Sequence, residues 1–122
     1  MQTIRIDGKL PGFIDYVRAV KTSPQAEEKL ASKASEIITW QLGRLFKIKT
    51  PCFIQFQWIE KTTRRNKESV AFAKKYIIDA LQKSEKLSGG TNSLTGFSDT
   101  FTYDTRRYGV KLTIWEAGDK NV

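Results

Sequence analysis

The feature that most constrains the fold is residues 52–60, an extended run with apolar side chains on both of its faces. Ile54, Phe56 and Trp58 share one face, and Phe53 and Ile59 share the other, because successive side chains of a strand point in opposite directions. A strand that is apolar on both faces is typical of the middle of a sheet. We therefore expect this segment to be the central strand of a β-sheet.

Shorter patterns place the other elements around this strand. Polar and apolar residues alternate over residues 3–7, which predicts a first strand. Ser23 and Pro24 suit the N-cap and the first helical position, so a helix with an apolar stripe is expected from there to about Leu45. The remaining regular elements are a second helix over about 69–84 and strands over 95–103 and 108–116. The segments expected to be irregular are an arm over 13–22, a loop over 88–93 and a polar tail over 117–122.

These elements follow the order β-α-β-α-β-β. With 122 residues the chain has room for one hydrophobic core, so we expect a single domain over residues 1–122. The expected fold class is α/β (α+β), with one mixed β-sheet and two main helices.

Composition limits the chemistry of the chain. It contains no histidine and one cysteine, which excludes Ser-His-Asp and Cys-His nucleophilic sites, histidine-ligated zinc and an internal disulfide. The net charge of +8 and the pI near 9.7 favour a polyanionic partner, because each phosphate that a cation contacts releases condensed counterions. Nucleic acid is therefore the expected partner class.

The expected location is the cytoplasm. No apolar run approaches the roughly 20 residues of a membrane span, and no apolar segment follows the first residues as in a signal peptide. No basic amphipathic helix with an aromatic face is evident either, so a membrane is not an expected partner.

Two apolar side chains outside the strands are assigned to packing. Cys52 lies in an apolar run and is expected to be a small buried residue. Trp40, near the end of the first helix, is expected to be a core or dimer-contact residue and not a platform on which a base stacks.

The segment from Arg64 to Leu81 holds the candidate site, because a basic loop there passes into an amphipathic helix. Asn66, Glu68 and Ser69 lie at the junction of loop and helix. Cations on both sides of the junction are candidates for contacts to DNA phosphates. The candidate DNA-binding residues are Arg64, Arg65, Lys67, Lys74, Lys75, Arg106 and Arg107.

The same segment resembles a RusA-type Holliday junction resolvase of the kind found in phages and prophages of low-GC Gram-positive bacteria. That branch has a strand ending in a Trp-x-Glu-Lys-like segment, then a basic pair, an Asp-x-Asp-Asn signature and a helix close to Ala-Phe-Ala-Lys-Lys-Phe-Ile-x-Asp-Ala-Leu. Here the corresponding stretches are residues 58–61, Arg64 with Arg65, residues 66–69 and residues 71–81. The early Leu-Pro-Gly-x-x-x-Tyr and the late Gly-Phe-x-Asp-x-Phe-x-x-Asp of the family match residues 10–16 and 96–104, so the resemblance covers most of the chain.

The resemblance implies a homodimer of small α/β subunits that binds four-way DNA junctions in the bacterial host. It also implies cleavage with Mg²⁺ held by three aspartates, assisted by a lysine at the phosphate. The positions of the aspartates are occupied here by Asn66, Glu68 and, by ungapped placement, Gly89, and the lysine corresponds to Lys75. The catalytic candidates are therefore Glu68 and Lys75, with Glu68 as the remaining candidate metal ligand.

Three functions are compatible with these replacements. In the first, the chain binds DNA, in particular branched DNA, without cutting it and needs no cofactor, because one carboxylate rarely holds Mg²⁺ by itself. In the second, an active Mg²⁺-dependent nuclease uses a rearranged site in which Glu60, Asp99 and Asp104 join Glu68. In the third, a phage or mobile-element protein uses the scaffold to bind a host protein. We expect the first.

Overall fold

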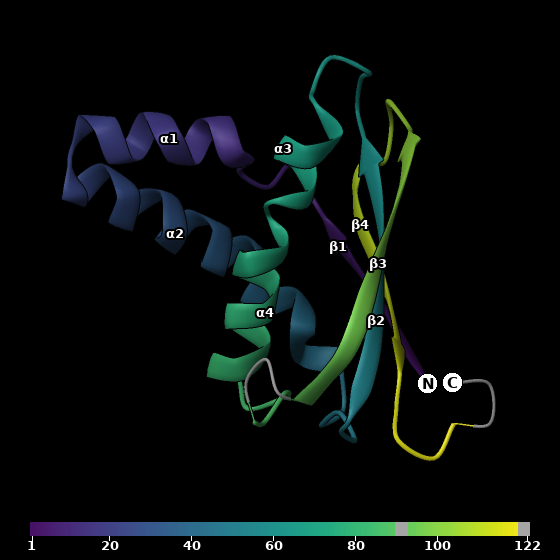
Figure 1. Cartoon of the computed structure of the whole chain (residues 1–122). Helices are drawn as coiled ribbons and strands as arrows, with labels where there is room; N and C mark the ends of the chain where they lie inside the picture. Colours follow the sequence, from purple (N-terminus) through teal and green to yellow (C-terminus); the bar gives the residue numbers. More distant parts are fainter. Residues whose placement is uncertain (90–92, 120–122) are drawn as a thin grey trace.

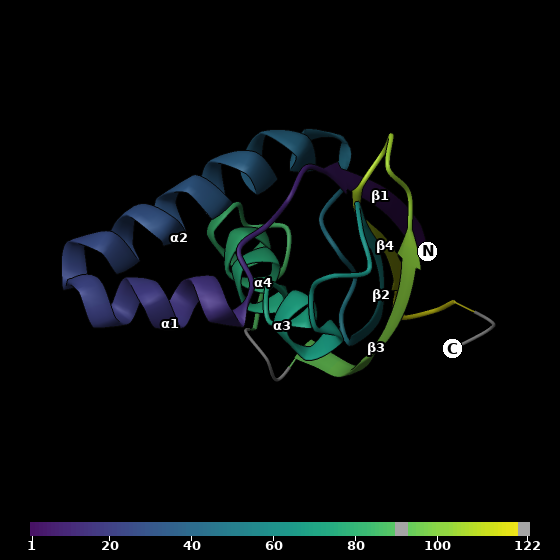
Figure 2. The same cartoon turned by 90° about the horizontal axis from the view of Figure 1, so that it is seen from above.

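The computed structural model describes residues 1–89 and 93–119, which form one mixed four-stranded sheet with its helices gathered on one face (Figure 1 and Figure 2). The strands are β1 (Gln2–Asp7), β2 (Cys52–Glu60), β3 (Leu94–Tyr103) and β4 (Gly109–Trp115). Their order across the sheet is β1-β4-β2-β3, which confirms β2 as a central strand. The expected mixed α/β class, with the order β-α-β-α-β-β, is confirmed at this level.

The direction of the strands explains why a helical segment must lie between β2 and β3. β2 is antiparallel to β4 but parallel to β3, and parallel neighbours need a crossover connection. The crossover consists of α3 (Lys67–Ala71) and α4 (Lys74–Lys83). The candidate loop is therefore held at the end of β2 where the crossover begins.

The core lies between the sheet and the helices. Ile54, Phe56 and Trp58 of β2 are buried on the helix side, while Phe53 and Gln55 on the opposite face are half-buried. On α2 (Pro24–Thr39), Ala34 and Ile38 complete the apolar stripe that the sequence predicts. Cys52 is buried in this core, as expected, and burial raises the pKa of its thiol.

The segment over 13–22, expected to be irregular, is a helix, α1 (Phe13–Thr22). Every side chain of α1 is at least partly exposed, so no apolar stripe of core residues reveals its period in the sequence. Its packing depends on aromatic contacts: the rings of Phe13 and Tyr16 lie 5.3 and 5.1 Å from that of Phe72. Ser23 separates α1 from α2 and accepts a hydrogen bond from the backbone N–H of Ala26, as predicted for an N-cap.

The second expected helix begins earlier than predicted and is interrupted. It starts at Lys67, because the side chain of Asn66 caps it, and it breaks at Phe72 and Ala73 before α4 begins. The first expected helix likewise ends in a separate 3-10 turn, η1 (Trp40–Arg44). Trp40 is 77% exposed, so the expectation that it lies in the core is wrong, while the alternative of a dimer contact stays a prediction.

The strands expected over 95–103 and 108–116 agree with β3 and β4 to within one residue. The expected loop over 88–93 and tail over 117–122 fall partly on residues 90–92 and 120–122, which lie outside the described residues. In the described part of the chain, none of the helices has the length and apolar character needed to cross a bilayer.

Candidate nucleic-acid interface

Asn66 connects the candidate loop to α3. Its side-chain oxygen accepts hydrogen bonds from the backbone N–H groups of Glu68 and Ser69, at 2.8 and 3.3 Å. These donors belong to the first turn of the helix and have no intrahelical partner, so the cap stabilises the start of α3. The side-chain carbonyl of Asn66, the atom that could have contacted a cation, is therefore already used in the fold.

Ser69 and Gly12 join this helix start to the N-terminal part of the chain. The Ser69 hydroxyl accepts a hydrogen bond of 3.4 Å from the backbone N–H of Ile14, at the beginning of α1. A Cβ added at Gly12 would lie 2.4 Å from the Arg65 guanidinium and 2.8 Å from the carbonyl oxygen of Ser69. The glycine of the Leu-Pro-Gly motif is thus required by the close approach of α3.

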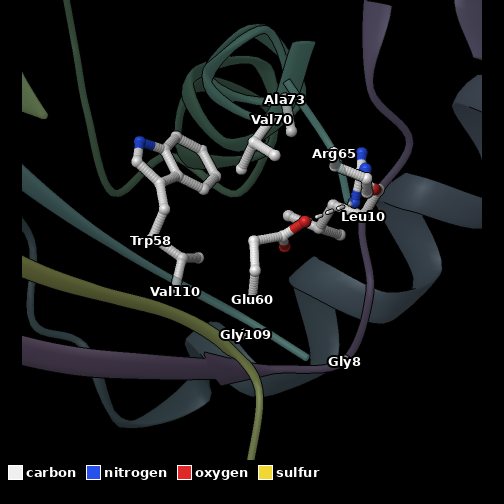
Figure 3. A pocket seen from close by; sticks show the side chains of 9 residues that line it. All are labelled: Gly8, Leu10, Trp58, Glu60, Arg65, Val70, Ala73, Gly109 and Val110. Carbon is white, nitrogen blue, oxygen red and sulfur yellow. Dashed lines mark hydrogen bonds and ion pairs between the residues drawn. The ribbon is translucent and has the colours of Figure 1, made fainter. Parts of the chain in front are cut away.

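Arg65 is a clamp within the fold, as Figure 3 shows. Its guanidinium lies 3.3 Å from the carboxylate of Glu60 and donates a hydrogen bond of 3.2 Å to the carbonyl of Leu10. The carboxylate of Asp15 also lies near, 4.0 Å from the guanidinium of Arg65. The side chain of Arg65 is only 19% exposed, so this cation ties β2 to the segment before α1 and has little surface left for a phosphate.

Lys74 is also held inside the structure. Its ammonium group donates a hydrogen bond of 2.8 Å to Asp99, and the other oxygen of that carboxylate accepts one from the indole of Trp58. The same ammonium lies 3.6 Å from the ring centroid of Phe97. This network fixes α4 to β3, and it holds the Lys74 side chain, 14% exposed, against the sheet.

Lys75 points to the other side of α4. Its ammonium lies 4.7 Å from the ring centroid of Tyr16 and 5.4 Å from those of Phe72 and Tyr76. The lysine that the resemblance assigns to the phosphate is therefore exposed beside α1 and surrounded by aromatic rings.

Gly89 is not brought close to Asn66 and Glu68, the other two positions at which the resemblance leads us to expect aspartates. Asn66 and Glu68 follow the end of β2, whereas Gly89 precedes β3, whose first residue pairs with Cys52 at the start of β2 (Figure 1). Because a strand rises by about 3.3 Å per residue, the two ends of β2 are roughly 25 Å apart. Within one chain, these positions cannot share a metal ion.

The acids Glu60, Asp99 and Asp104, which could join Glu68 in a rearranged metal site, are each already bound to a neighbouring group. Glu60 pairs with Arg65, Asp99 pairs with Lys74, and Asp104 accepts hydrogen bonds from two backbone N–H groups of its own turn. Glu68 is exposed. Within residues 1–89 and 93–119, no three acidic or cysteine side chains gather as a metal site would require.

The turn after β3 brings two arginines to the same end of the sheet. The backbone N–H groups of Arg106 and Arg107 bind the Asp104 carboxylate at 2.9 and 3.2 Å, which holds its pKa below the usual range. The Asp104 N–H donates to the carbonyl of Glu60 at 2.8 Å, so the turn is fixed to the end of β2. Arg107 then turns toward β1, where its guanidinium lies 3.3 Å from Asp7.

A cleft of about 370 Å³ opens between the basic loop that follows β2 and the turn that precedes β4. It is lined by Lys9, Glu60, Lys61, Thr62, Arg64, Arg65 and Tyr108. Because Arg65 neutralises Glu60, the cleft keeps a positive charge from its remaining cations. Lys67 at the start of α3 and Arg106 on the turn are exposed at the same end of the sheet.

We call this set of exposed cations the cationic end; its members are Lys9, Lys61, Arg64, Lys67 and Arg106. Three of them were candidates from the sequence. Lys9 and Lys61 were not among the candidates: Lys9 is far from the loop in sequence, and Lys61 is the first residue of the basic loop, before the two arginines. The other candidates do not belong to this set. Arg65 and Lys74 are paired with Glu60 and Asp99 inside the fold, Lys75 lies beside α1, and Arg107 faces Asp7 on β1.

The chain matches no family model and no curated protein. The resemblance to RusA-type resolvases therefore rests on the motifs themselves.

Proposed function

We propose that this protein is a RusA-like, metal-independent DNA-binding protein that prefers branched DNA, in particular four-way junctions, and has lost the cleavage activity of that family. The observation that carries the proposal is the cationic end. Two loops that are distant in sequence meet there, and the five exposed lysines and arginines outnumber the exposed acids at that end, Asp7, Glu68 and Asp104. Such a surface favours a polyanion whose phosphates lie a few ångströms apart.

The loss of cleavage follows from the chemistry of Asn66. An aspartate at an N-cap can accept backbone hydrogen bonds with one carboxylate oxygen and still offer the second to a cation. The second terminal atom of asparagine is an amide nitrogen, which carries two hydrogens and is not a metal ligand. With the only side-chain oxygen of Asn66 used by α3, Glu68 is left as the sole carboxylate at the junction that could hold Mg²⁺.

A homodimer is part of the proposal. A four-way junction has approximate twofold symmetry, and a C2 dimer would present two cationic ends to it. The separation of position 89 from positions 66 and 68 supports the same conclusion, since a RusA-type site containing all three could assemble only from two chains.

The experiment is a fluorescence anisotropy titration of a four-way junction and of a linear duplex, in EDTA and at several salt concentrations. We expect tighter binding to the junction in the absence of metal. The double variant Arg64→Glu with Lys67→Glu should weaken binding. It should also make the plot of log association constant against log salt concentration less steep by about two, because each phosphate contact contributes about 0.9 to the slope. The matched control reverses Lys29 and Lys33, which are exposed on α2.

Three results would overturn the proposal. Equal losses in the loop pair and the α2 control would mean that only net charge matters. Junction cutting with Mg²⁺ or Mn²⁺ that disappears in Glu68→Ala would mean that the nuclease site is still active. An absence of binding to any DNA at low salt would instead favour a protein partner, such as a host factor.

A further inference from the structure

A second groove, of about 500 Å³, lies along β1 and η1 on a different part of the surface from the cleft. Its lining includes Thr3, Arg5, Trp40, Gln41, Arg44 and Arg107. β1 is an edge strand, so the groove runs along the edge of the sheet that no further strand covers. None of the contacts proposed for the cationic end involves it.

Side-chain amides join the two walls of the groove near both ends of β1. The amide of Gln41 accepts a hydrogen bond from the Asp7 N–H at 2.8 Å and donates to the Asp7 carbonyl at 3.0 Å. At the other end, the amide of Gln2 makes the same pair of bonds with the N–H and carbonyl of Phe46, at 2.8 and 3.0 Å. β1 and the η1 region are therefore fixed relative to each other before any ligand binds, which lowers the entropic cost of binding.

Trp40 gives the groove an unusual apolar surface. Trp40 is 77% exposed, although tryptophan has one of the largest apolar side chains and is usually buried for the most part. An exposed aromatic ring beside cations is the arrangement with which proteins bind unpaired bases, because every base has a face that can stack. In duplex DNA the faces of the bases are already stacked on one another and are not available.

The charge of the groove matches a nucleic-acid backbone. Three arginines and one carboxylate, Asp7, line it. Asp7 is shared by Arg5 and Arg107, and the hydrogen bond from Arg5 is the main reason that the pKa of Asp7 lies below its usual range. Within the described residues Arg44 forms no ion pair, and the Arg107 side chain remains 65% exposed, so both can reach a phosphate.

We propose that this groove binds single-stranded DNA, with a base stacked on Trp40 and the flanking phosphates contacted by Arg44 and Arg107. This activity goes beyond junction binding and uses a separate surface. It also reverses the expectation from the sequence that Trp40 is not a platform on which a base stacks. An acidic peptide that adds to the edge of β1 would use the same cations, but it would leave the exposed indole without a stacking partner. The combination of arginine and indole therefore favours single-stranded DNA as the occupant.

The test uses a fluorescein-labelled oligo(dT) of about 12 nucleotides, within the range of site sizes of single-strand-binding grooves. Trp40→Ala should weaken binding about tenfold, since loss of one base–aromatic stack has an effect of this order. The matched control is Phe46→Ala, which removes an aromatic side chain that is 80% exposed but does not line the groove. Arg44→Glu should weaken binding more than Lys33→Glu, which changes the net charge equally on α2.

The inference is overturned if Trp40→Ala binds oligo(dT) within twofold of the wild type, or if Phe46→Ala weakens binding equally. It is also overturned if the wild type does not bind oligo(dT), in which case a synthetic acidic peptide becomes the next probe for the edge of β1. The two proposals fail separately. Arg64→Glu with Lys67→Glu should lower junction binding more than oligo(dT) binding, and Trp40→Ala should do the reverse.

Discussion

Arg64 and Arg65 are neighbours in the basic loop, yet the structure predicts opposite consequences of their removal. Arg64 is exposed on the wall of the cleft, while Arg65 is 19% exposed and bound to Glu60 and to the carbonyl of Leu10. We therefore expect Arg65→Ala to lower stability, and Arg64→Ala to lower DNA affinity with little change in stability.

The size of the stability loss follows from the contacts of Arg65. A hydrogen bond to a charged group contributes about 1.5–3 kcal/mol, and the Glu60 carboxylate, only 15% exposed, would lose its partner. We expect Arg65→Ala to lower the free energy of unfolding by about 2–3 kcal/mol. For a chain of this length, that corresponds to a decrease in Tm of roughly 10 °C. Arg64→Ala should stay within about 0.5 kcal/mol of the wild type.

The assay is urea unfolding followed by tryptophan fluorescence, since Trp58 is buried next to this site and reports on its loss. A double-mutant cycle of Arg65→Ala with Glu60→Gln should show coupling, because the two side chains are in direct contact. The reasoning is refuted if Arg65→Ala unfolds at the same urea concentration as the wild type and instead loses DNA affinity. Arg65 would then be a DNA contact and not a clamp.

Four further predictions follow from the same region and from the sheet edge. Gly12→Ala should lower stability by about 1–3 kcal/mol in urea unfolding, because its Cβ would collide with the backbone of α3. Asn66→Ala should cost about 1 kcal/mol through loss of the cap, whereas Asn66→Asp, which caps equally well, should be nearly neutral. The pKa of Asp7 is lowered in the fold, so the ionised carboxylate stabilises the folded state near neutral pH, and this stabilisation is lost as the pH falls below about 4. Asp7→Asn should therefore make Tm fall less steeply with decreasing pH on the acid side. If a dimer brings position 89 of one subunit to positions 66 and 68 of the other, Asn66→Asp, Glu68→Asp and Gly89→Asp together should produce Mg²⁺-dependent junction cutting; an inactive triple variant in a cleavage assay would count against such a shared site.

Much of the fold could be predicted because its signals are local. The alternation over residues 52–60 predicts a central strand, and Ser23 with Pro24 predicts the start of α2, since both patterns depend on residues that are close in sequence. α1 was missed for a physical reason. Its side chains contact Phe72 and remain partly exposed, so its period is set by a distant element and not by a stripe of core residues.

The sequence identifies a group of cations around one loop, but it does not distinguish the surroundings of the individual residues. A sequence identifies Arg64, Arg65, Lys74 and Lys75 equally as cations in and after a basic loop. Only the fold distinguishes them, because it places Glu60 and Leu10 beside Arg65, Asp99 beside Lys74, and aromatic rings beside Lys75. Whether a cation is available to a phosphate depends on its three-dimensional neighbours.

The sequence by itself determined the net charge of the chain, the strand order along it and the absence of histidine chemistry, since these depend on composition and on neighbouring residues. It also carries Asn66, Glu68 and Gly89 at the positions where the resemblance to RusA-type resolvases leads us to expect aspartates. Tertiary structure decided that Asn66 is a helix cap, that Gly89 lies at the far end of β2, and that Trp40 is exposed beside three arginines. Each of these facts depends on contacts or distances between segments far apart in the chain, which only the folded sheet and its helices bring into place.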